Sequence, residues 1–172
     1  GIAKNGGVPV FGTFAPFLQR VYDQVSHDLC LNDNPATILV INPGVYGMNS
    51  DTHIAMCDIQ EFSHIPNLIY LAPATKNEYE AALKFATSES KHPVGIRVPS
   101  FWCKLDNDNL TDFTKNMIVN NGDKVAIVAV GPMLKMALEV SKVIKEKLNK
   151  DITIINPINL SNLDYETLNG LK

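Results

Sequence analysis

The chain has 172 residues, of which 45% are hydrophobic and 19% are charged, and its formal net charge at pH 7 is −3. This ordinary globular balance, with no cluster of lysine or arginine and no apolar run of bilayer length, argues against nucleic acid or membrane as a partner. The three cysteines, Cys30, Cys57 and Cys103, lie far apart without metal-ligand spacing, so we expect reduced thiols in a cytoplasmic protein.

The first part of the chain reads as a strand followed by a helix. Residues 1–7 resemble a helix end that runs into a glycine turn, which suggests that the sequence continues upstream. A short buried strand is predicted over 8–12, and Thr13 and Pro16 are placed to begin a helix after it. An apolar stripe with four-residue spacing predicts this helix, and it consists of Phe17, Val21, Val25 and Leu29.

Strands and helices then alternate along the chain. The predicted elements are a strand over 37–41, a loop over 42–55, a helix over 56–64, a strand over 67–72, a helix over 75–86 and a strand over 94–98. Thr75 and Glu78 have the spacing of a capping box at the second of these helices. This alternation predicts a four-stranded parallel sheet with right-handed crossovers.

A polar stretch over 102–122 is predicted as a linker to a second unit. The elements predicted for that unit are a strand over 124–130, a helix from 132, a strand over 152–155 and a helix over 163–171. Two strands alone would leave an exposed sheet edge, so we expect the second unit to continue downstream. The predicted division is therefore 1–101, a linker over 102–122, and a partial unit over 123–172.

Phe14, Phe17 and Arg20 lie on or just past the first strand-to-helix turn. Ligands of open α/β sheets bind at the carboxyl ends of strands, so two rings and a cation there could hold a flat polar heterocycle. Periodicity alone favours the alternative, in which both rings are core and Arg20 forms a surface ion pair. His53 lies in a glycine-containing loop after a strand, either as a working histidine or as an exposed loop residue.

Several stretches, in collinear order, resemble the 1-deoxy-D-xylulose-5-phosphate synthases of the transketolase-like thiamine diphosphate family. They are Phe17-Leu-Gln-Arg20, Tyr22-Asp-Gln-Val25, Thr52-His53, Ile65-Pro-Asn67, Ala72-Pro73 and residues 93–99. The resemblance covers essentially the whole chain. It implies a three-layer α/β fold, with a thiamine diphosphate pyrimidine-binding domain over 1–101 and the first part of a transketolase-type C-terminal domain over 123–172.

The resemblance also implies an activity. In the family, thiamine diphosphate is anchored through Mg²⁺, pyruvate is decarboxylated, and the two-carbon unit is joined to glyceraldehyde 3-phosphate, which feeds isoprenoid, thiamine and pyridoxal precursors. The partners implied are small-molecule substrates and, for the full-length protein, a second copy in a homodimer. The family's metal motif and its key glutamate have no match in this chain, so we expect no metal ligands here and no activity from these residues alone.

Family positions assign expected roles to four residues. Phe14, Phe17 and Arg20 align with residues at the cofactor's pyrimidine site, although the family usually has tyrosine at the position of Phe14. His53 aligns with a substrate-side histidine, which implies a catalytic role in proton transfer or in binding substrate oxygens.

Three further positions, Asn42, Asn49 and Ser100, align with substrate-binding residues but depart from the family pattern. The family has arginine at the positions of Asn42 and Ser100, where it holds the acceptor's phosphate, and aspartate at the position of Asn49. Losing two guanidinium groups removes bidentate, charge-assisted contacts, which weakens the inference about the acceptor but not about the fold. Two alternatives stay open: a transketolase-like enzyme with a different acceptor, and a non-catalytic subunit that has kept the fold.

Overall fold

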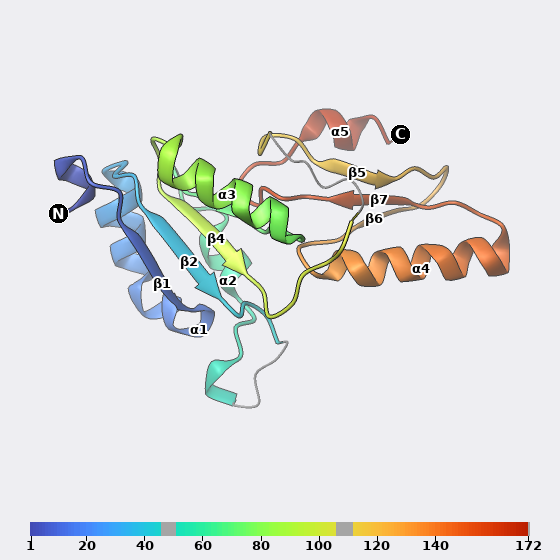
Figure 1. Ribbon diagram of the computed structural model, residues 1–172, viewed down its shortest axis with the longest axis horizontal. Coiled ribbons are helices and arrows are strands. Elements are labelled where there is room, and N and C mark those ends of the chain that lie inside the picture. The colour runs from blue at the N-terminus through green and yellow to red at the C-terminus, as the bar shows by residue number, and fades with distance from the viewer. Residues whose placement is uncertain (46–50, 106–111, 172) are drawn as a thin grey trace.

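The computed structural model describes residues 1–45, 51–105 and 112–171. The chain forms two α/β units that lie side by side, with the N-terminus at the far end of the first unit and the C-terminus beside the second sheet (Figure 1). The first unit contains a four-stranded sheet and the second a three-stranded sheet. Within the described ranges, none of the helices combines the length and the hydropathy that a membrane crossing requires.

The first sheet is parallel throughout, with strand order β1-β2-β4-β3. Its strands are β1 (Val10–Phe14), β2 (Thr37–Ile41), β3 (Ile69–Leu71) and β4 (Val94–Val98). The β-branched run of β2 lies between β1 and β4, as predicted for a strand that is buried on both faces. Because the strands are parallel, their carboxyl ends all lie along one edge of the sheet.

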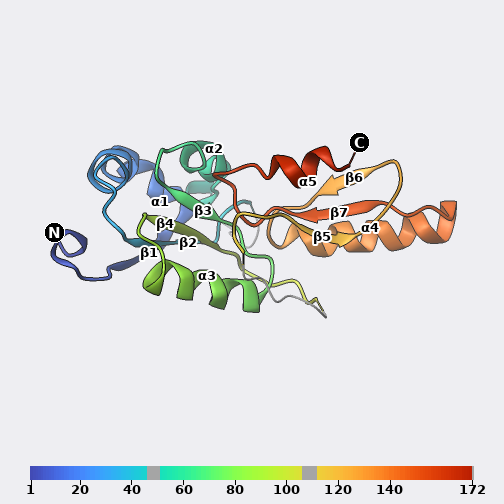
Figure 2. The ribbon, with the colours of Figure 1, turned by 90° about the horizontal axis from the view of Figure 1, so that it is seen from above.

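Helices cover both faces of this sheet. Helix α3 (Lys76–Ser88) lies on one face, and α1 (Ala15–Leu18) and α2 (Asp58–Phe62) lie on the other, as Figure 2 shows. Separate buried clusters fill the two interfaces, with Leu18 and Phe62 in one and Ala82 and Ile96 in the other. The predicted three-layer α/β arrangement of the first unit is therefore confirmed.

The helical stretch after β1 differs from the regular α-helix that the apolar stripe predicted. Helix α1 is only one turn long, and a 3₁₀ turn (Gln19–Val21) and a π-helical segment (Gln24–Leu31) follow it. Hydrogen bonds in a π-helix join residues five apart, so the buried positions leave the four-residue stripe. Val25 and Cys30, five residues apart, are both buried. Thr13, predicted to cap this helix, instead belongs to β1.

The second sheet has the order β5-β7-β6, with β6 parallel and β5 antiparallel to β7. Its strands are β5 (Met117–Asn120), β6 (Ala126–Val128) and β7 (Thr153–Asn156), and the helices of the unit are α4 (Met133–Leu148) and α5 (Tyr165–Asn169). Strand β5 lies inside the stretch 102–122 that we predicted as a linker, so this sheet has three described strands rather than two, and β5 makes it a mixed sheet. Only a short connection joins β5 to β6, and it leaves no room for the crossover helix that two parallel strands would need. The two strands therefore run in opposite directions on either side of β7. The domain boundaries themselves stay a prediction.

A buried carboxylate fastens the two units together. Glu78 Oε2 accepts hydrogen bonds from the main-chain N–H groups of Ala74 (2.6 Å) and Thr75 (3.3 Å), while Thr75 Oγ1 accepts one from the N–H of Glu78 (3.1 Å). This is the predicted capping box. The other oxygen, Oε1, accepts a hydrogen bond from Asn156 Nδ2 in β7 (2.8 Å), so the group that starts α3 also holds the second sheet.

Main-chain hydrogen bonds close the outer edge of β3 with the segment that follows β7. The N–H of Ala72 donates to the carbonyl of Ile158 (2.7 Å), and the N–H of Leu160 donates to the carbonyl of Tyr70 (2.8 Å). The N–H of Tyr70 in turn donates to Ser161 Oγ (2.7 Å). A chain segment of the second unit therefore satisfies backbone groups that a free sheet edge would leave exposed.

Gly95 in β4 leaves room for the ring of Tyr70, because a Cβ at position 95 would lie 2.7 Å from Tyr70 Cδ2. The ring cannot move away easily, since it is 1% exposed and its hydroxyl donates to Asp58 Oδ2 at 2.5 Å. We expect Gly95→Ala to lower the free energy of unfolding by about 1–3 kcal/mol, as measured by urea denaturation. Gly12→Ala in β1 is the matched control, with its nearest contact at 3.6 Å and little expected change. Equal losses in the two variants would contradict the close approach of Tyr70.

Asp164 caps α5 with three hydrogen bonds to its carboxylate, and these predict a pH dependence. The Thr167 hydroxyl (2.5 Å), the Asn116 N–H (2.9 Å) and the Thr167 N–H (3.1 Å) all donate to it, and they lower its pKa to about 2. A carboxyl with a lowered folded pKa stabilises the fold fully above its unfolded pKa of about 3.9 and loses that contribution as the pH falls toward the folded value. Asp164→Asn should therefore lower the melting temperature at neutral pH, with a difference from the wild type that shrinks between about pH 4 and 2. A difference that stays constant over this range would contradict the role of the carboxylate.

Candidate functional site

Three aromatic side chains meet at the edge where the parallel strands end. Phe14 is the last residue of β1, Phe17 follows in α1, and His53 lies in a 3₁₀ turn (Asp51–His53) in the loop after β2. The ring centroids of Phe17 and His53 are 5.1 Å apart, those of Phe14 and His53 are 6.3 Å apart, and those of the two phenylalanines are 6.4 Å apart. All three pairs are edge-to-face, a favoured geometry for aromatic rings. We call Phe14, Phe17 and His53 the ring cluster.

The ring cluster is not part of the hydrophobic core. Phe14 is 39% exposed and Phe17 is 37% exposed, which overturns the interpretation of both rings as core that periodicity alone favoured. The loss of the regular helical stripe explains the difference, because the residues of α1 that are buried in the core are Ala15 and Leu18. Partly exposed rings that hold one another in place leave aromatic surface available to a flat ligand.

His53 is oriented by its neighbour and by the loop that carries it. Thr52 Oγ1 and His53 Nδ1 share a hydrogen bond of 2.9 Å. Two residues later, the N–H of Ala55 donates to the carbonyl of Gly44 (3.3 Å), which ties the loop back to the end of β2. The imidazole is thereby held at the carboxyl edge of the sheet rather than free in solvent.

The other predicted site residues lie outside the ring cluster. Arg20 is exposed in the 3₁₀ turn after α1. Asn42 directly follows β2 in a left-handed conformation (φ 50°), and its N–H donates to the carbonyl of Val98 (2.9 Å). Ser100 is exposed two residues beyond β4. Asn49 lies outside the described residues.

A pocket of about 200 Å³ lies where the two units meet, and we call it the junction pocket. Segments 43–45, 72–73 and 99–101, which follow β2, β3 and β4, line one side of it together with Arg97. The turn over 130–133, between β6 and α4, lines the other side. Sequence reasoning missed the contribution of this turn, for which the only signal was its position directly after a predicted strand.

A buried ion pair lies behind the junction pocket. Arg97 Nε and Nη2 donate to the two carboxylate oxygens of Asp58 at 2.7 and 3.3 Å, and the side chains are 11% and 3% exposed. The Tyr70 hydroxyl also donates to Asp58, and burial together with the charge of Asp58 raises the pKa of Tyr70 well above its usual value. The phenol is therefore a permanent donor, and the guanidinium is fixed in place.

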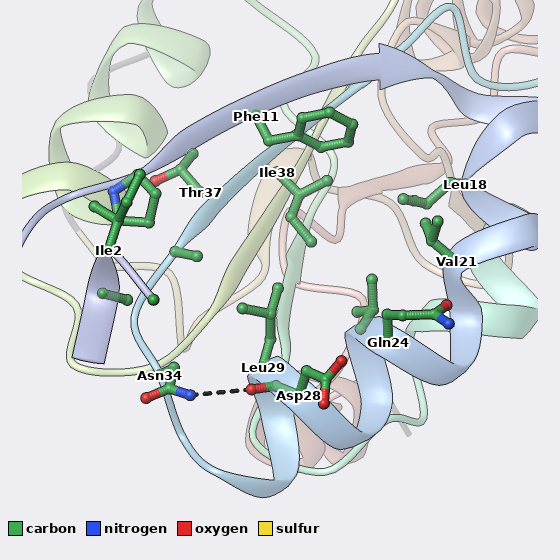
Figure 3. Close-up of a pocket in the computed structure, with 15 residues that line it drawn as sticks. Ile2, Phe11, Leu18, Val21, Gln24, Asp28, Leu29, Asn34, Thr37 and Ile38 are labelled. Atoms are coloured by element: carbon green, nitrogen blue, oxygen red, sulfur yellow. Dashed lines mark hydrogen bonds between the residues drawn. The ribbon is translucent and has the colours of Figure 1, made fainter. Parts of the chain in front are cut away.

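A larger pocket of about 560 Å³ lies elsewhere, at the amino-terminal ends of β1 and β2. Figure 3 shows that its walls are mostly apolar, with Phe11, Leu18, Leu29 and Ile38 among them. A hydrogen bond from Asn34 Nδ2 to the Asp28 carbonyl (3.0 Å) borders it. This pocket is at the opposite end of the strands from the ring cluster, so we place the candidate site at the carboxyl edge.

Comparison with known families accounts for both units. Residues 1–100 match the family described as transketolase, pyrimidine binding domain, and residues 114–172 match the family described as transketolase, C-terminal domain. A 1-deoxy-D-xylulose-5-phosphate synthase of Clostridium perfringens is 38% identical over 175 residues, which cover 100% of this chain and 28% of that protein. The synthase of Clostridium tetani is 34% identical over 173 residues, which cover 99% and 28%. The chain thus spans less than a third of the length of these curated relatives.

Solved structures share the fold. A split gene transketolase, described as an inactive beta4 tetramer, aligns with a TM-score of 0.86 and 24% identity, over 98% of this chain and 55% of that chain. A transketolase of Pichia stipitis aligns with a TM-score of 0.81 and 20% identity, over 93% and 25% of the two chains. At these identities the likeness concerns the fold alone.

The exposure of Phe17 predicts that its ring contributes little to stability. Phe62 is the matched control, because it is 1% exposed and packs between the rings of Tyr22 and Tyr70. We expect Phe62→Leu to lower the free energy of unfolding by about 1–1.5 kcal/mol and Phe17→Leu by about 0.5 kcal/mol or less, in urea denaturation. A loss for Phe17→Leu as large as that for Phe62→Leu would return Phe17 to the core.

Proposed function

The chain belongs to the transketolase family, and from this premise we propose that it supplies the pyrimidine-binding and C-terminal parts of a thiamine diphosphate-dependent transferase. The proposed reaction is that of 1-deoxy-D-xylulose-5-phosphate synthase, in which pyruvate loses CO₂ and its two-carbon unit is joined to an aldehyde, glyceraldehyde 3-phosphate. The observation that carries the proposal is the ring cluster at the carboxyl edge of a parallel sheet.

The residues of the ring cluster fit the pyrimidine ring of the cofactor. Phe14 and Phe17 present partly exposed aromatic surface, and Arg20 adds a cation nearby in the chain. Thiamine diphosphate, when bound, supplies the electron sink for decarboxylation and two-carbon transfer. No stretch of these 172 residues resembles the family's diphosphate motif, so we expect other parts of the protein to hold the diphosphate and Mg²⁺, and these residues to be inactive alone.

His53 is the proposed catalytic residue. With one ring nitrogen in a hydrogen bond to Thr52, the nitrogen on the opposite side of the imidazole can hold or deliver a proton at a substrate oxygen. Its place in the ring cluster puts this proton beside the surface that we assign to the cofactor. Cofactor binding and proton transfer would then take place side by side at the edge of the sheet where the parallel strands end.

A second candidate keeps the cofactor and changes the acceptor. Asn42 and Ser100 are neutral where the synthases carry arginines, and both lie at the ends of strands that border the junction pocket. Asn49 is the third proposed substrate position. A non-catalytic role is the remaining alternative, because the split gene transketolase assembly described as inactive has the same fold; the ring cluster favours an enzyme.

The test uses the full-length parent protein, purified with thiamine diphosphate and Mg²⁺ and assayed for pyruvate consumption in the presence of an aldehyde. His53→Ala should lower kcat by about 10²–10⁴-fold, the usual contribution of a general acid or base. His64→Ala, an exposed histidine hydrogen-bonded to the Gln60 carbonyl in α2, should leave kcat unchanged. A parent protein that binds the cofactor yet never consumes pyruvate would overturn the proposal.

A further inference from the structure

The segment that carries His53 is tied to the first sheet by a buried carboxylate. We propose that Asp58 is a positioning residue for His53. Its hydrogen bonds to the sheet fix the end of the loop and so hold the imidazole against the ring of Phe17. This inference rests on the proposed role of His53 in catalysis, but the place of the imidazole can be measured without any turnover.

The turn that carries His53 needs an anchor, because it projects beyond the carboxyl edge of the sheet (Figure 1). The hydrogen bond between Thr52 and His53 lies within the turn and moves with it. The edge-to-face contact with Phe17 orients the imidazole, yet a single aromatic pair adds little energy. The place of the turn therefore depends on the chain on either side of it, and the side that the structure describes is residues 54–58.

Ala55 and Asp58 attach this following chain to the rest of the unit. Ala55 is 2% exposed, and its N–H donates to the carbonyl of Gly44 at 3.3 Å, slightly beyond the usual range for such a bond. Asp58, three residues later, is the first residue of α2 and is 4% exposed. Its carboxylate is the stronger anchor, because charge-assisted hydrogen bonds are shorter and roughly twice as strong as neutral ones.

The Asp58 carboxylate is bonded to two strands of the sheet. Oδ2 accepts from the Tyr70 hydroxyl in β3 at 2.5 Å and from Arg97 Nε in β4 at 2.7 Å, and Oδ1 accepts from Arg97 Nη2 at 3.3 Å. The Arg97 and Asp58 side chains are 11% and 3% exposed. At this depth water does not replace a lost partner, so moving the loop away would leave two buried charges unpaired.

Local capping does not fix the start of α2. Among its described contacts, the N-cap residue Cys57 makes no side-chain hydrogen bond to the first turn. The helix has only five residues, and short helices have little stability of their own. The hydrogen bonds of Asp58 to the sheet therefore place both the helix and the loop in front of it.

The same anchor keeps the loop over the helix that carries Phe17. Ala55 belongs to the buried cluster that also contains Leu18 of α1, the helix in which Phe17 lies. While Asp58 holds the chain against the sheet, Ala55 stays in this cluster and His53 stays beside Phe17. Without the anchor, we expect the imidazole to leave Phe17 before the core of the unit is lost.

The first experiment follows the imidazole signals of the 172-residue chain by NMR. The chain has four histidines, and the signal of His53 is identified by its loss in His53→Ala. The wild type should show a nuclear Overhauser effect between the rings of His53 and Phe17, whose centroids are 5.1 Å apart. Asp58→Asn keeps the size of the side chain but removes the negative charge that Arg97 requires. This variant should lose the effect and shift the His53 signal, while the signals of the other histidines outside the loop serve as internal references.

Two milder variants decide the question if Asp58→Asn does not fold. Tyr70→Phe removes one of the three hydrogen bonds to the carboxylate, and Arg97→Lys keeps the charge but loses the planar fork. The His53 signal should move least in Tyr70→Phe and more in Arg97→Lys. Ile154→Ala opens a cavity in the core of the second unit, so it controls for lost stability and should leave the His53 signal in place.

The second experiment is a double-mutant cycle in the full-length parent protein, with thiamine diphosphate and Mg²⁺ present. Asp58→Asn should lower kcat by about tenfold or more, because a misplacement of about 1 Å can cost about 10²-fold. In the His53→Ala background the same change should lower kcat by less than about twofold, because the imidazole through which it acts is gone. A merely structural role would cost the same factor in both backgrounds.

Equal factors in the two backgrounds would contradict the inference. So would a His53 signal that Asp58→Asn and Arg97→Lys leave unmoved, or one that Ile154→Ala moves as far as they do. The NMR result does not depend on turnover. A parent protein that never consumes pyruvate would therefore count against the proposed transferase function, while the NMR result still decides whether Asp58 positions His53.

Discussion

The buried carboxylate of Glu78 is the interaction on which the arrangement of the two units depends. A carboxylate taken out of water is costly unless donors surround it, and here the start of α3 and the side chain of Asn156 supply them. These partners come from both units, so the observed orientation of the second unit is the one that places Asn156 against the carboxylate. That orientation brings the turn between β6 and α4 to the carboxyl edge of the first sheet and so creates the junction pocket.

Parallel strands impose the second constraint, because they deliver every strand end to the same edge. The edge is divided by side-chain chemistry: aromatic rings stand at the end of β1, and prolines with a compensated arginine stand at the ends of β2, β3 and β4. Asp58 fixes the position of the guanidinium group at this edge, since its carboxylate accepts hydrogen bonds from both Arg97 in β4 and Tyr70 in β3. The proposed cofactor surface at the end of β1 and the junction pocket at the ends of β2, β3 and β4 are thus neighbours along one edge of the sheet, and a transfer between two bound groups requires such proximity.

The candidate site was only partly predictable. Phe14, Phe17 and His53 were each singled out by residue type, by position after a strand, and by resemblance to a family. The sequence did not predict that these side chains contact one another, because Phe17 and His53 are 36 positions apart and no local pattern encodes which loop packs against which helix. Arg97 shows the same limit, since its partner Asp58 lies 39 residues away and decides whether the guanidinium can meet a ligand.

Local patterns in the sequence by itself determined the alternation of strands and helices in the first unit, its β-branched strand β2, strand β4 and the capping box of α3. These features depend on neighbours within a few residues, where periodicity and capping are physically encoded. Only the tertiary structure decided that β5 joins the second sheet as an antiparallel strand, that the helix after β1 becomes π-helical, and that Glu78 reaches Asn156. Each of these features depends on contacts between segments that are far apart in the sequence. The energies of those contacts arise only when packing removes both partners from water.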